Sequence, residues 1–256
     1  MSYGNQFKAH TQLKLSPFFE RTSKLNESQE WRRWSGYLAA TNYELTHENE
    51  YFAIRTKAAL LDITPLYKYI IEGPDAQLFL NRMVTRNIGI CNIGQVMYTP
   101  WCDEDGKQID DGTVQRLSDH KFRITSAEPN LEWIEYNAAG MDISILDDSY
   151  STAALAIQGP NSRTILNAVA NDSLNNLKFF WMMETRFGDI PVSISRTGYT
   201  GDLGYEIWMD SEDALSVWDL LMDKGKPFGI TPTGLQALDI ARIEAGLILL
   251  DVDYIS

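Results

Sequence analysis

Two short segments carry the side chains whose types and spacing best suit chemistry. The first, Gly198-Tyr-Thr-Gly-Asp-Leu-Gly204, superficially resembles a phosphate loop. A strand pattern follows it, so no helix N-terminus is available to hold a phosphate, and we reject nucleotide binding here. Its three glycines in seven residues instead predict a tight hairpin whose backbone can lie against a flat ligand.

Glu206 comes soon after the last of these glycines. Strand alternation places it on the same face as Trp208, and the opposite face then carries Tyr205, Ile207 and Met209. A carboxylate beside an aromatic ring suits the edge of a guanidine-like heterocycle, because its two oxygens match two parallel N–H donors. The alternative is a solvent-facing glutamate on an edge strand, since glutamate is mostly exposed.

The second segment is Ile109-Asp110-Asp111-Gly112. Adjacent strand residues point to opposite faces, so only one of the two aspartates can face a given pocket. A desolvated carboxylate in that pocket would hold an amine by a hydrogen bond and stabilise a developing cationic carbon. The alternative is turn formation, because Asp and Gly both favour turns.

Arg242 shares an apolar helical stripe with Leu235, Leu238 and Ala245. An arginine on such a stripe needs a partner. Asp239, three residues earlier, is the structural candidate, and an anionic ligand or a buried carboxylate is the functional one. The sequence leaves both open.

Composition narrows the function classes. The 256 residues carry 22 basic and 35 acidic side chains, and the net charge of −13 repels phosphate backbones and anionic lipids. Neither nucleic acid nor a membrane is therefore an expected partner. The start lacks the apolar segment of a signal peptide, and Cys91 and Cys102 are the only cysteines, which favours a cytoplasmic location. His10, His47 and His120 share no spacing, so no metal site is expected.

Apolar periodicity and an internal repeat predict an α+β fold. Helices are expected over 26–34, 48–61, 214–222 and 235–245, and strands over 67–71, 95–98, 107–114, 122–125, 153–157, 192–196 and 205–209. Residues 71–81 and 157–167 agree at matched Ile, Gly, Pro, Leu and Asn positions, which indicates a duplicated unit. Two such units predict antiparallel or mixed sheets with helices on one side. The alternative is that Gly-Pro simply begins many helices.

Several short segments, in order between Glu50 and Gly246, resemble the folate-binding aminomethyltransferase family, typified by the glycine cleavage T-protein. They are Arg55-Thr-Lys-Ala-Ala-Leu-Leu-Asp-Ile, Gly73-Pro-Asp-Ala, Asp105-Gly-Lys-Gln-Ile-Asp-Asp, Ile157-Gln-Gly-Pro-Asn, Thr197-Gly-Tyr-Thr-Gly-Asp-Leu-Gly-Tyr-Glu-Ile and Ala241-Arg-Ile-Glu-Ala-Gly. The resemblance implies intertwined, ferredoxin-like split βαβ units around a central folate pocket. It implies one α+β domain from 1–49 and 146–233, and a second, interwoven one from 50–145 and 234–256.

For function, the resemblance implies that tetrahydrofolate accepts a one-carbon unit from a small amine or onium donor, as in an aminomethyltransferase or demethylase. It places Asp110 in the catalytic position and Glu206 at the pterin edge. The pocket lining would include Tyr98, Tyr199 and Arg242. The alternative is a non-catalytic folate-binding protein with a regulatory or iron–sulfur maintenance role.

Two departures from the family pattern qualify these expectations. Residues 34–40, Trp-Ser-Gly-Tyr-Leu-Ala-Ala, stand in place of a Gly-Trp-x-Met-Pro stretch, so the aminomethyl-lipoyl arm is not the expected donor. The sequence ends at Ser256, where family members continue, so the family's C-terminal β-barrel domain is expected to be absent from this chain. The intact Asp110-Asp111 pair favours amine chemistry.

Overall fold

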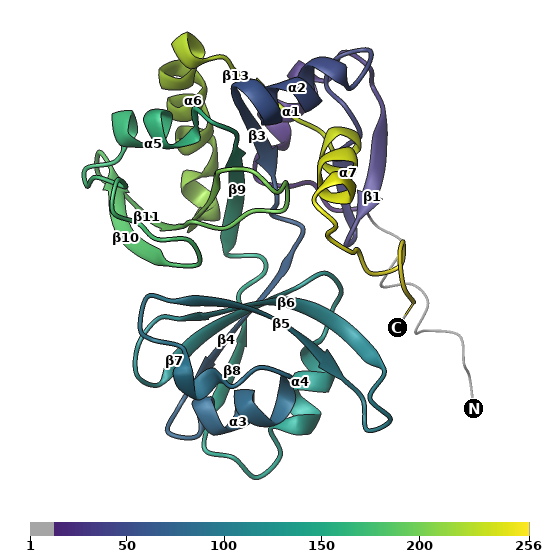
Figure 1. Ribbon diagram of the computed structural model, residues 1–256, viewed down its shortest axis with the longest axis vertical. Coiled ribbons are helices and arrows are strands. Elements are labelled where there is room, and N and C mark those ends of the chain that lie inside the picture. Colours follow the sequence, from purple (N-terminus) through teal and green to yellow (C-terminus); the bar gives the residue numbers. More distant parts are fainter. Residues whose placement is uncertain (1–12, 256) are drawn as a thin grey trace.

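The computed structural model describes residues 13–255, which form two large β-sheets and the helices that cover them (Figure 1). The six-stranded sheet contains β3 (Ala58–Asp62), β9 (Thr152–Gln158), β10 (Met182–Phe187), β11 (Ile190–Ser195), β12 (Gly204–Asp210) and β13 (Ile230–Pro232). The five-stranded sheet contains β4 (Tyr67–Glu72), β5 (Val96–Cys102), β6 (Gln108–Arg116), β7 (Lys121–Ser126) and β8 (Ser144–Asp147). The helices are α1 (Phe19–Leu25), α2 (Glu48–Thr56), α3 (Ala76–Met83), α4 (Leu131–Asn137), α5 (Ser162–Val169), α6 (Ala214–Gly225) and α7 (Leu235–Glu244).

The strand orders are β10-β11-β12-β9-β3-β13 and β5-β6-β7-β4-β8. The pair β13 and β3 is parallel, and the other neighbouring strands of both sheets are antiparallel. A separate hairpin joins β1 (Trp31–Trp34) to β2 (Tyr37–Ala40). The predicted α+β class with antiparallel and mixed sheets is therefore confirmed.

Each sheet buries one face under its own helices (Figure 1). The five-stranded sheet packs Tyr69 and Phe122 against α3 and α4, and the six-stranded sheet packs Leu155 and Tyr205 against α5 and α6. The opposite face of the six-stranded sheet is covered in part by α2 and α7. The remaining area of that face lies toward the five-stranded sheet, where Arg123 of β7 stacks over the Trp208 ring at 5.5 Å.

The repeated Gly-Pro segments adopt matching structures in the two sheets. β4 leads through Gly73 into α3, and β9 leads through Gly159 into α5. Gly73 has φ +146° and Gly159 has φ +119°, values that L side chains rarely adopt. A Cβ on Gly73 would lie 2.4 Å from the Asp142 carbonyl oxygen, and one on Gly159 would lie 2.7 Å from that of Lys57. Both glycines are therefore required by conformation and by close backbone approach.

The asparagine that ends each of the two repeated segments also makes an equivalent contact in both. The Asn81 Oδ1 accepts a hydrogen bond from the Ile88 backbone N–H at 2.6 Å. The Asn167 Oδ1 accepts one from the Leu174 N–H at 2.8 Å, again seven residues further on. The shared geometry supports the interpretation of the two segments as copies of one unit.

The predicted helix over 26–34 is wrong. The α1 helix ends at Leu25, and residues 31–34 form β1 instead. The Asn26 Oδ1 accepts a hydrogen bond from the Gln29 N–H at 2.9 Å, which forms a turn that competes with helix formation. Ser35 and Gly36 then both have positive φ and reverse the chain into β2.

The predicted helix over 48–61 is correct only as far as Thr56. Residues 58–62 form β3, which is buried between β9 and β13. A strand buried on both faces is a continuous apolar run, and periodicity cannot distinguish such a run from a buried helix. The other predicted strands and helices are present with ends that differ by a few residues.

The sheets do not follow the predicted division at every point. The five-stranded sheet uses a continuous part of the chain, residues 67–147. The β3 strand lies within the predicted 50–145 domain, yet it pairs with β9 and β13 of the other sheet. The division into two domains stays a prediction.

Candidate active site

A cavity of about 420 Å³ lies between the two sheets and is lined mostly by apolar groups. The five-stranded sheet contributes Tyr98 and Asp111, and the six-stranded sheet contributes Glu206 and Trp208. The glycine-rich hairpin, α7 and the segment after it complete the wall. A volume of this size is in the ordinary range for a small-molecule site, and the few polar groups would orient a ligand.

Asp110 and Asp111 face opposite sides of the five-stranded sheet. The Asp110 side chain is fully buried on the helix-covered side, and Asp111 lines the cavity. The Asp110 Oδ1 accepts a hydrogen bond from the Asp111 N–H at 2.7 Å. Its Oδ2 accepts from the Glu128 N–H at 3.0 Å and from the Asn130 Nδ2 at 2.7 Å. Asp110 is thus not among the residues that line the cavity, and its catalytic role stays a prediction.

Burial raises the pKa of Asp110 to about 6, although three hydrogen bonds oppose that effect. By accepting these hydrogen bonds, the Asp110 carboxylate fixes the turn at residues 128–130 and the backbone of Asp111. Asp110 therefore supports the backbone behind the wall of the cavity. Asp111 is the member of the pair that faces the cavity.

The Asp111 carboxylate lies among polar side chains at the edge of the cavity. Its Oδ1 accepts hydrogen bonds from the Tyr254 hydroxyl and, at 3.4 Å, from the Gln108 Nε2. The hydroxyl of Tyr98 is close by. Burial raises the pKa of Tyr98 to about 12, with the Asp111 charge as the next cause. Asp111 is thus held by neutral groups and has no cationic partner among residues 13–255.

Glu206 lies on the cavity face of β12, as strand alternation predicts. Glu206 and Trp208 line the cavity, whereas the side chains that alternate with them belong to the core: Tyr205, Ile207 and Met209. The Glu206 Oε2 accepts a hydrogen bond from the Thr197 hydroxyl at 2.7 Å. Burial raises the pKa of Glu206, and within the described part of the chain no basic side chain pairs with it. A half-buried carboxylate that faces a cavity without a cation is suited to an N–H donor on a ligand.

The glycine hairpin packs around a protein side chain. A Cβ on Gly198 would lie 2.2 Å from the Gln158 Oε1, and one on Gly204 would lie 1.9 Å from the same atom. The Thr200 hydroxyl donates a hydrogen bond to that oxygen at 2.9 Å. The flat group that these two glycines approach is therefore the Gln158 amide. Tyr199 lines the cavity, and its hydroxyl donates to the Ile248 carbonyl.

Arg242 does not line the cavity, which differs from the sequence expectation. Its side chain is only 3% exposed and pairs with Asp239 at 3.4 Å and with Asp253. It also donates to the Leu247 carbonyl at 3.1 Å. The structural candidate, Asp239, is thus present, and Asp253 is a second partner that the sequence did not suggest. Arg242 anchors the segment from Leu247 to Asp253, whose first four residues wall the cavity.

Of the five predicted site residues, the structure brings three together at the cavity: Tyr98, Tyr199 and Glu206. Their roles toward a ligand stay predictions. The sequence interpretation missed three arginines in the lining: Arg32, Arg33 and Arg86. Arg32 and Arg33 are adjacent in the sequence between Trp31 and Trp34, which could have indicated a basic wall. The sequence pattern instead predicts a helix there.

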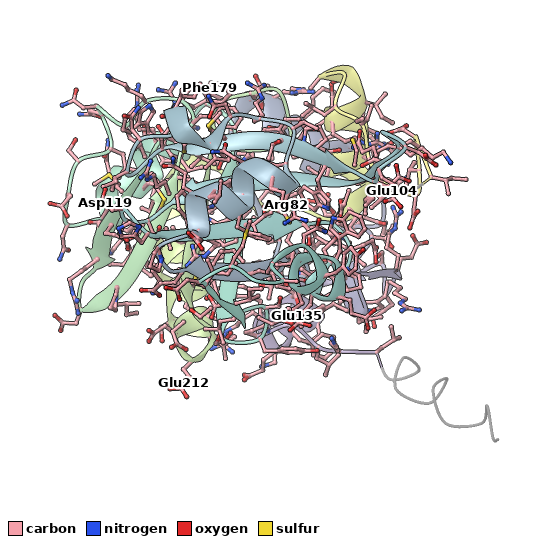
Figure 2. The ribbon with its side chains drawn as sticks, turned by 90° about the horizontal axis from the view of Figure 1, so that it is seen from below. Arg82, Glu104, Asp119, Glu135, Phe179 and Glu212 are labelled. Atoms are coloured by element: carbon pink, nitrogen blue, oxygen red, sulfur yellow. The ribbon has the colours of Figure 1, made fainter. Side chains whose placement is uncertain are left out.

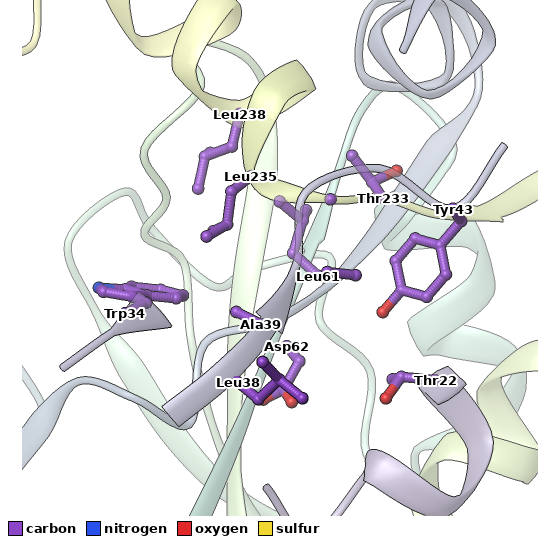
Figure 3. Close-up of a pocket in the computed structure, with 12 residues that line it drawn as sticks. Thr22, Trp34, Leu38, Ala39, Tyr43, Leu61, Asp62, Thr233, Leu235 and Leu238 are labelled. Carbon is purple, nitrogen blue, oxygen red and sulfur yellow. The ribbon is translucent and has the colours of Figure 1, made fainter. Parts of the chain in front are cut away.

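A second pocket of about 20 Å³ lies behind the cavity wall (Figure 3). It shares four lining residues with the cavity: Trp34, Leu61, Leu235 and Leu238. Figure 3 shows Thr22 and Tyr43 on one side of it and Trp34 on the other. Space of this size holds one or two waters, so the pocket is too small for a folate-sized ligand.

The described residues contain no group of three or more His, Cys, Asp or Glu side chains able to hold a metal ion. His10 lies outside the described residues. Within 13–255 no helix has both the length and the apolar character needed to cross a bilayer.

The sequence model of the GCVT N-terminal domain matches residues 18–256. The chain belongs to this family. It is 36% identical over 242 residues to an aminomethyltransferase of Halothermothrix orenii, covering 93% of this chain and 66% of the relative. It is 41% identical over 216 residues to a trimethylamine-oxide aldolase of Ruegeria pomeroyi, covering 80% of this chain and 27% of that protein.

The fold agrees with this membership. The crystal structure of the glycine cleavage system aminomethyltransferase T from Bartonella henselae superposes with a TM-score of 0.83 at 26% identity. The match covers 93% of this chain and 64% of that protein. The chain thus spans about two-thirds or less of the length of these GCVT relatives.

Proposed function

We propose that the cavity binds tetrahydrofolate and that the protein transfers a one-carbon unit to it from a small amine or onium donor. The observation that carries this proposal is the half-buried Glu206 carboxylate, which has no ion-pair partner in residues 13–255 and faces an apolar cavity beside Trp208. The edge of a pterin ring presents parallel N–H donors that match such a carboxylate. The names of the aminomethyltransferase relatives support the same class of reaction.

The residues of the cavity fit a pterin in shape as well as in charge. Trp208, Leu61 and Ile63 supply apolar walls for a flat ring, and Glu206 supplies the acceptor at its edge. Because Glu206 is desolvated, a hydrogen bond to it from the ring is stronger than the same bond in water. We propose that Tyr98 and Tyr199 line the remainder of the folate site.

When bound, tetrahydrofolate supplies the nucleophilic nitrogen that accepts the one-carbon unit. Asp111 faces the cavity and is placed to orient the cationic donor and to offset positive charge as the carbon departs. Asp110 acts through its neighbour, since its carboxylate accepts the Asp111 N–H. We therefore assign the ligand contact to Asp111 and the positioning role to Asp110.

A turnover assay tests this proposal. The protein is incubated with tetrahydrofolate and one of several donors, among them dimethylglycine, sarcosine, sulfonium compounds and, given the aldolase relative, trimethylamine N-oxide. Formation of methyl-tetrahydrofolate from an amine or sulfonium donor, or of methylene-tetrahydrofolate from trimethylamine N-oxide, whose N–O group supplies the oxidising equivalents, supports the transferase. Folate binding without product from any donor would support the non-catalytic folate-binding alternative instead.

A further inference from the structure

Two buried hydroxyl groups lie beside the Glu206 carboxylate. Ser195, the last residue of β11, is opposite Glu206 in the pairing of β11 with β12. Thr197 follows two residues later and donates the hydrogen bond to Glu206 Oε2 at 2.7 Å. Ser195 is fully buried and Thr197 is only 4% exposed. The orientation of both hydroxyls therefore depends on their protein neighbours rather than on bulk water.

The two hydroxyls connect Glu206 to the ring of Trp208. The Trp208 Nε1–H donates to Ser195 Oγ at 3.4 Å, and Ser195 Oγ lies 2.7 Å from Thr197 Oγ1. With the bond from Thr197 to Glu206, these contacts form a continuous series of three hydrogen bonds, the hydroxyl chain. At its start, the Trp208 ring is held by Arg123 of the five-stranded sheet, which stacks over it at 5.5 Å.

The two ends of the hydroxyl chain fix its direction. An indole N–H can only donate, so Ser195 Oγ accepts from Trp208 and its own proton is available for Thr197. The single hydroxyl proton of Thr197 is directed to Glu206, so Thr197 accepts from Ser195. Every bond thus donates toward the carboxylate. This direction favours the ionised form of Glu206, because an ionised carboxylate accepts a stronger hydrogen bond than the neutral acid does.

Burial acts on Glu206 in the opposite direction. It raises the pKa of Glu206, whereas hydrogen bonding by Thr197 and Ser195 lowers that pKa. Glu206 has no ion pair with any residue in 13–255. The other charged groups of the lining are Arg32, Arg33, Arg86, Asp111 and Asp239, and its tyrosines are Tyr98 and Tyr199. Hydroxyl donors, rather than a cation, therefore oppose the effect of burial on Glu206.

We propose that Ser195 and Thr197 are positioning residues, which extend the Trp208 N–H donor to Glu206 and keep its carboxylate ionised and oriented. This inference rests on the proposed function and deepens it, because it explains how a half-buried carboxylate remains an acceptor for the pterin edge. It also gives Trp208 a second role, since the same ring that lines the cavity begins the hydroxyl chain.

The first measurement is the pKa of Glu206 in the protein without folate. Carbon-13 NMR of glutamate-labelled protein reports it, and Glu206→Gln assigns the carboxyl resonance. Thr197→Val keeps the shape of the side chain but removes the hydroxyl, so it should raise this pKa by about one pH unit or more. Thr197→Ser retains the hydroxyl and should keep the wild-type value. Ser195→Ala should raise the pKa by less, because Thr197 still donates to Glu206.

Thr185→Val is the matched control. Thr185 is also a buried threonine whose hydroxyl donates to a carboxylate, that of Asp172 at 2.8 Å, and neither residue lines the cavity. This variant should leave the pKa of Glu206 unchanged.

The second measurement is the affinity for tetrahydrofolate at a series of pH values, by calorimetry. Binding should weaken as pH falls through the pKa of Glu206, because the protonated group loses its charge as an acceptor. The midpoint of this loss should lie at higher pH in Thr197→Val than in wild type and Thr185→Val.

An unchanged Glu206 pKa in Thr197→Val, or a raised one in Thr197→Ser as well, would overturn the inference. If Thr197→Val does not fold, Ser195→Ala decides the question, and an unchanged Glu206 pKa in that variant would overturn it. Failure of wild type to bind tetrahydrofolate is a separate result. It would remove the proposed function, whereas the NMR titration would still show whether the hydroxyl chain keeps Glu206 ionised.

Discussion

Asp110 and Asp111 are adjacent in β6, yet their carboxylates lie on opposite faces of the five-stranded sheet. Asp110 is buried on the helix side, where it accepts hydrogen bonds from the turn at residues 128–130. Asp111 lines the cavity between the sheets. One carboxylate of this pair therefore supports a turn behind the cavity wall, and the other faces the cavity.

The first prediction concerns turnover. Asp111→Asn should lower kcat by about two or more orders of magnitude with folate affinity nearly unchanged, because the lost charge acts on the departing carbon. Asp110→Asn, the matched control, should reduce stability more than it reduces the rate of the folded enzyme. Steady-state kinetics and urea unfolding of both variants check this. A larger loss of kcat in folded Asp110→Asn would restore Asp110 to the catalytic position.

The second prediction concerns pH and stability. Burial raises the pKa of Asp110 to about 6, above the roughly 3.9 of an unfolded chain. Folding therefore favours the protonated form of Asp110. The stabilisation that this pKa shift gives is complete below about pH 4 and is lost as pH rises through about 6. The difference between the folded and unfolded pKa of Asp110 corresponds to roughly 3 kcal/mol of free energy of unfolding.

Asp110→Asn removes this titration. The free energy of unfolding of wild type, minus that of the variant, should therefore fall between about pH 4 and pH 7. Denaturant unfolding at a series of pH values measures it. A difference that does not change with pH would show that the Asp110 pKa is the same in the folded and unfolded chains.

The third prediction concerns the repeated glycine turn. Gly159→Ala should destabilise the fold by about 2–4 kcal/mol, because the new Cβ would meet backbone oxygens at a positive φ. Gly188→Ala is the control, since its φ is +59° and no atom lies within 4 Å of the added Cβ. It should cost only about 1–2 kcal/mol. If Gly159→Ala and Gly188→Ala have the same urea midpoint of unfolding, the requirement for glycine at this turn is contradicted.

The sequence predicted the fold best where one local rule decided the outcome. Alternation placed Glu206 and Trp208 on one face, and the repeat placed a glycine before both α3 and α5. The same alternation separated Asp110 from Asp111 but could not say which one faces the cavity. That choice depends on which face of the sheet the helices cover, and this is a property of the tertiary fold.

The arginines of the cavity were harder to predict for a similar reason. Arg86 comes just after α3, and no local pattern indicates that its backbone bonds to β5 beside Tyr98. The apolar stripe left Asp239 and an anionic ligand both open as partners of Arg242, and only the family resemblance implied that it lines the pocket. Asp253, eleven residues later, pairs with it through a turn that helical periodicity does not predict.

The most direct test of the account is the affinity of tetrahydrofolate for wild type and Glu206→Gln, measured by calorimetry. We expect micromolar-range binding to wild type. Glu206→Gln should weaken it by roughly tenfold to a hundredfold, because one charged partner of the pterin edge is lost. Glu212→Gln, at the exposed position seen in Figure 2, should bind as wild type does. Equal affinities for wild type and Glu206→Gln would remove Glu206 from the folate site and contradict the central claim.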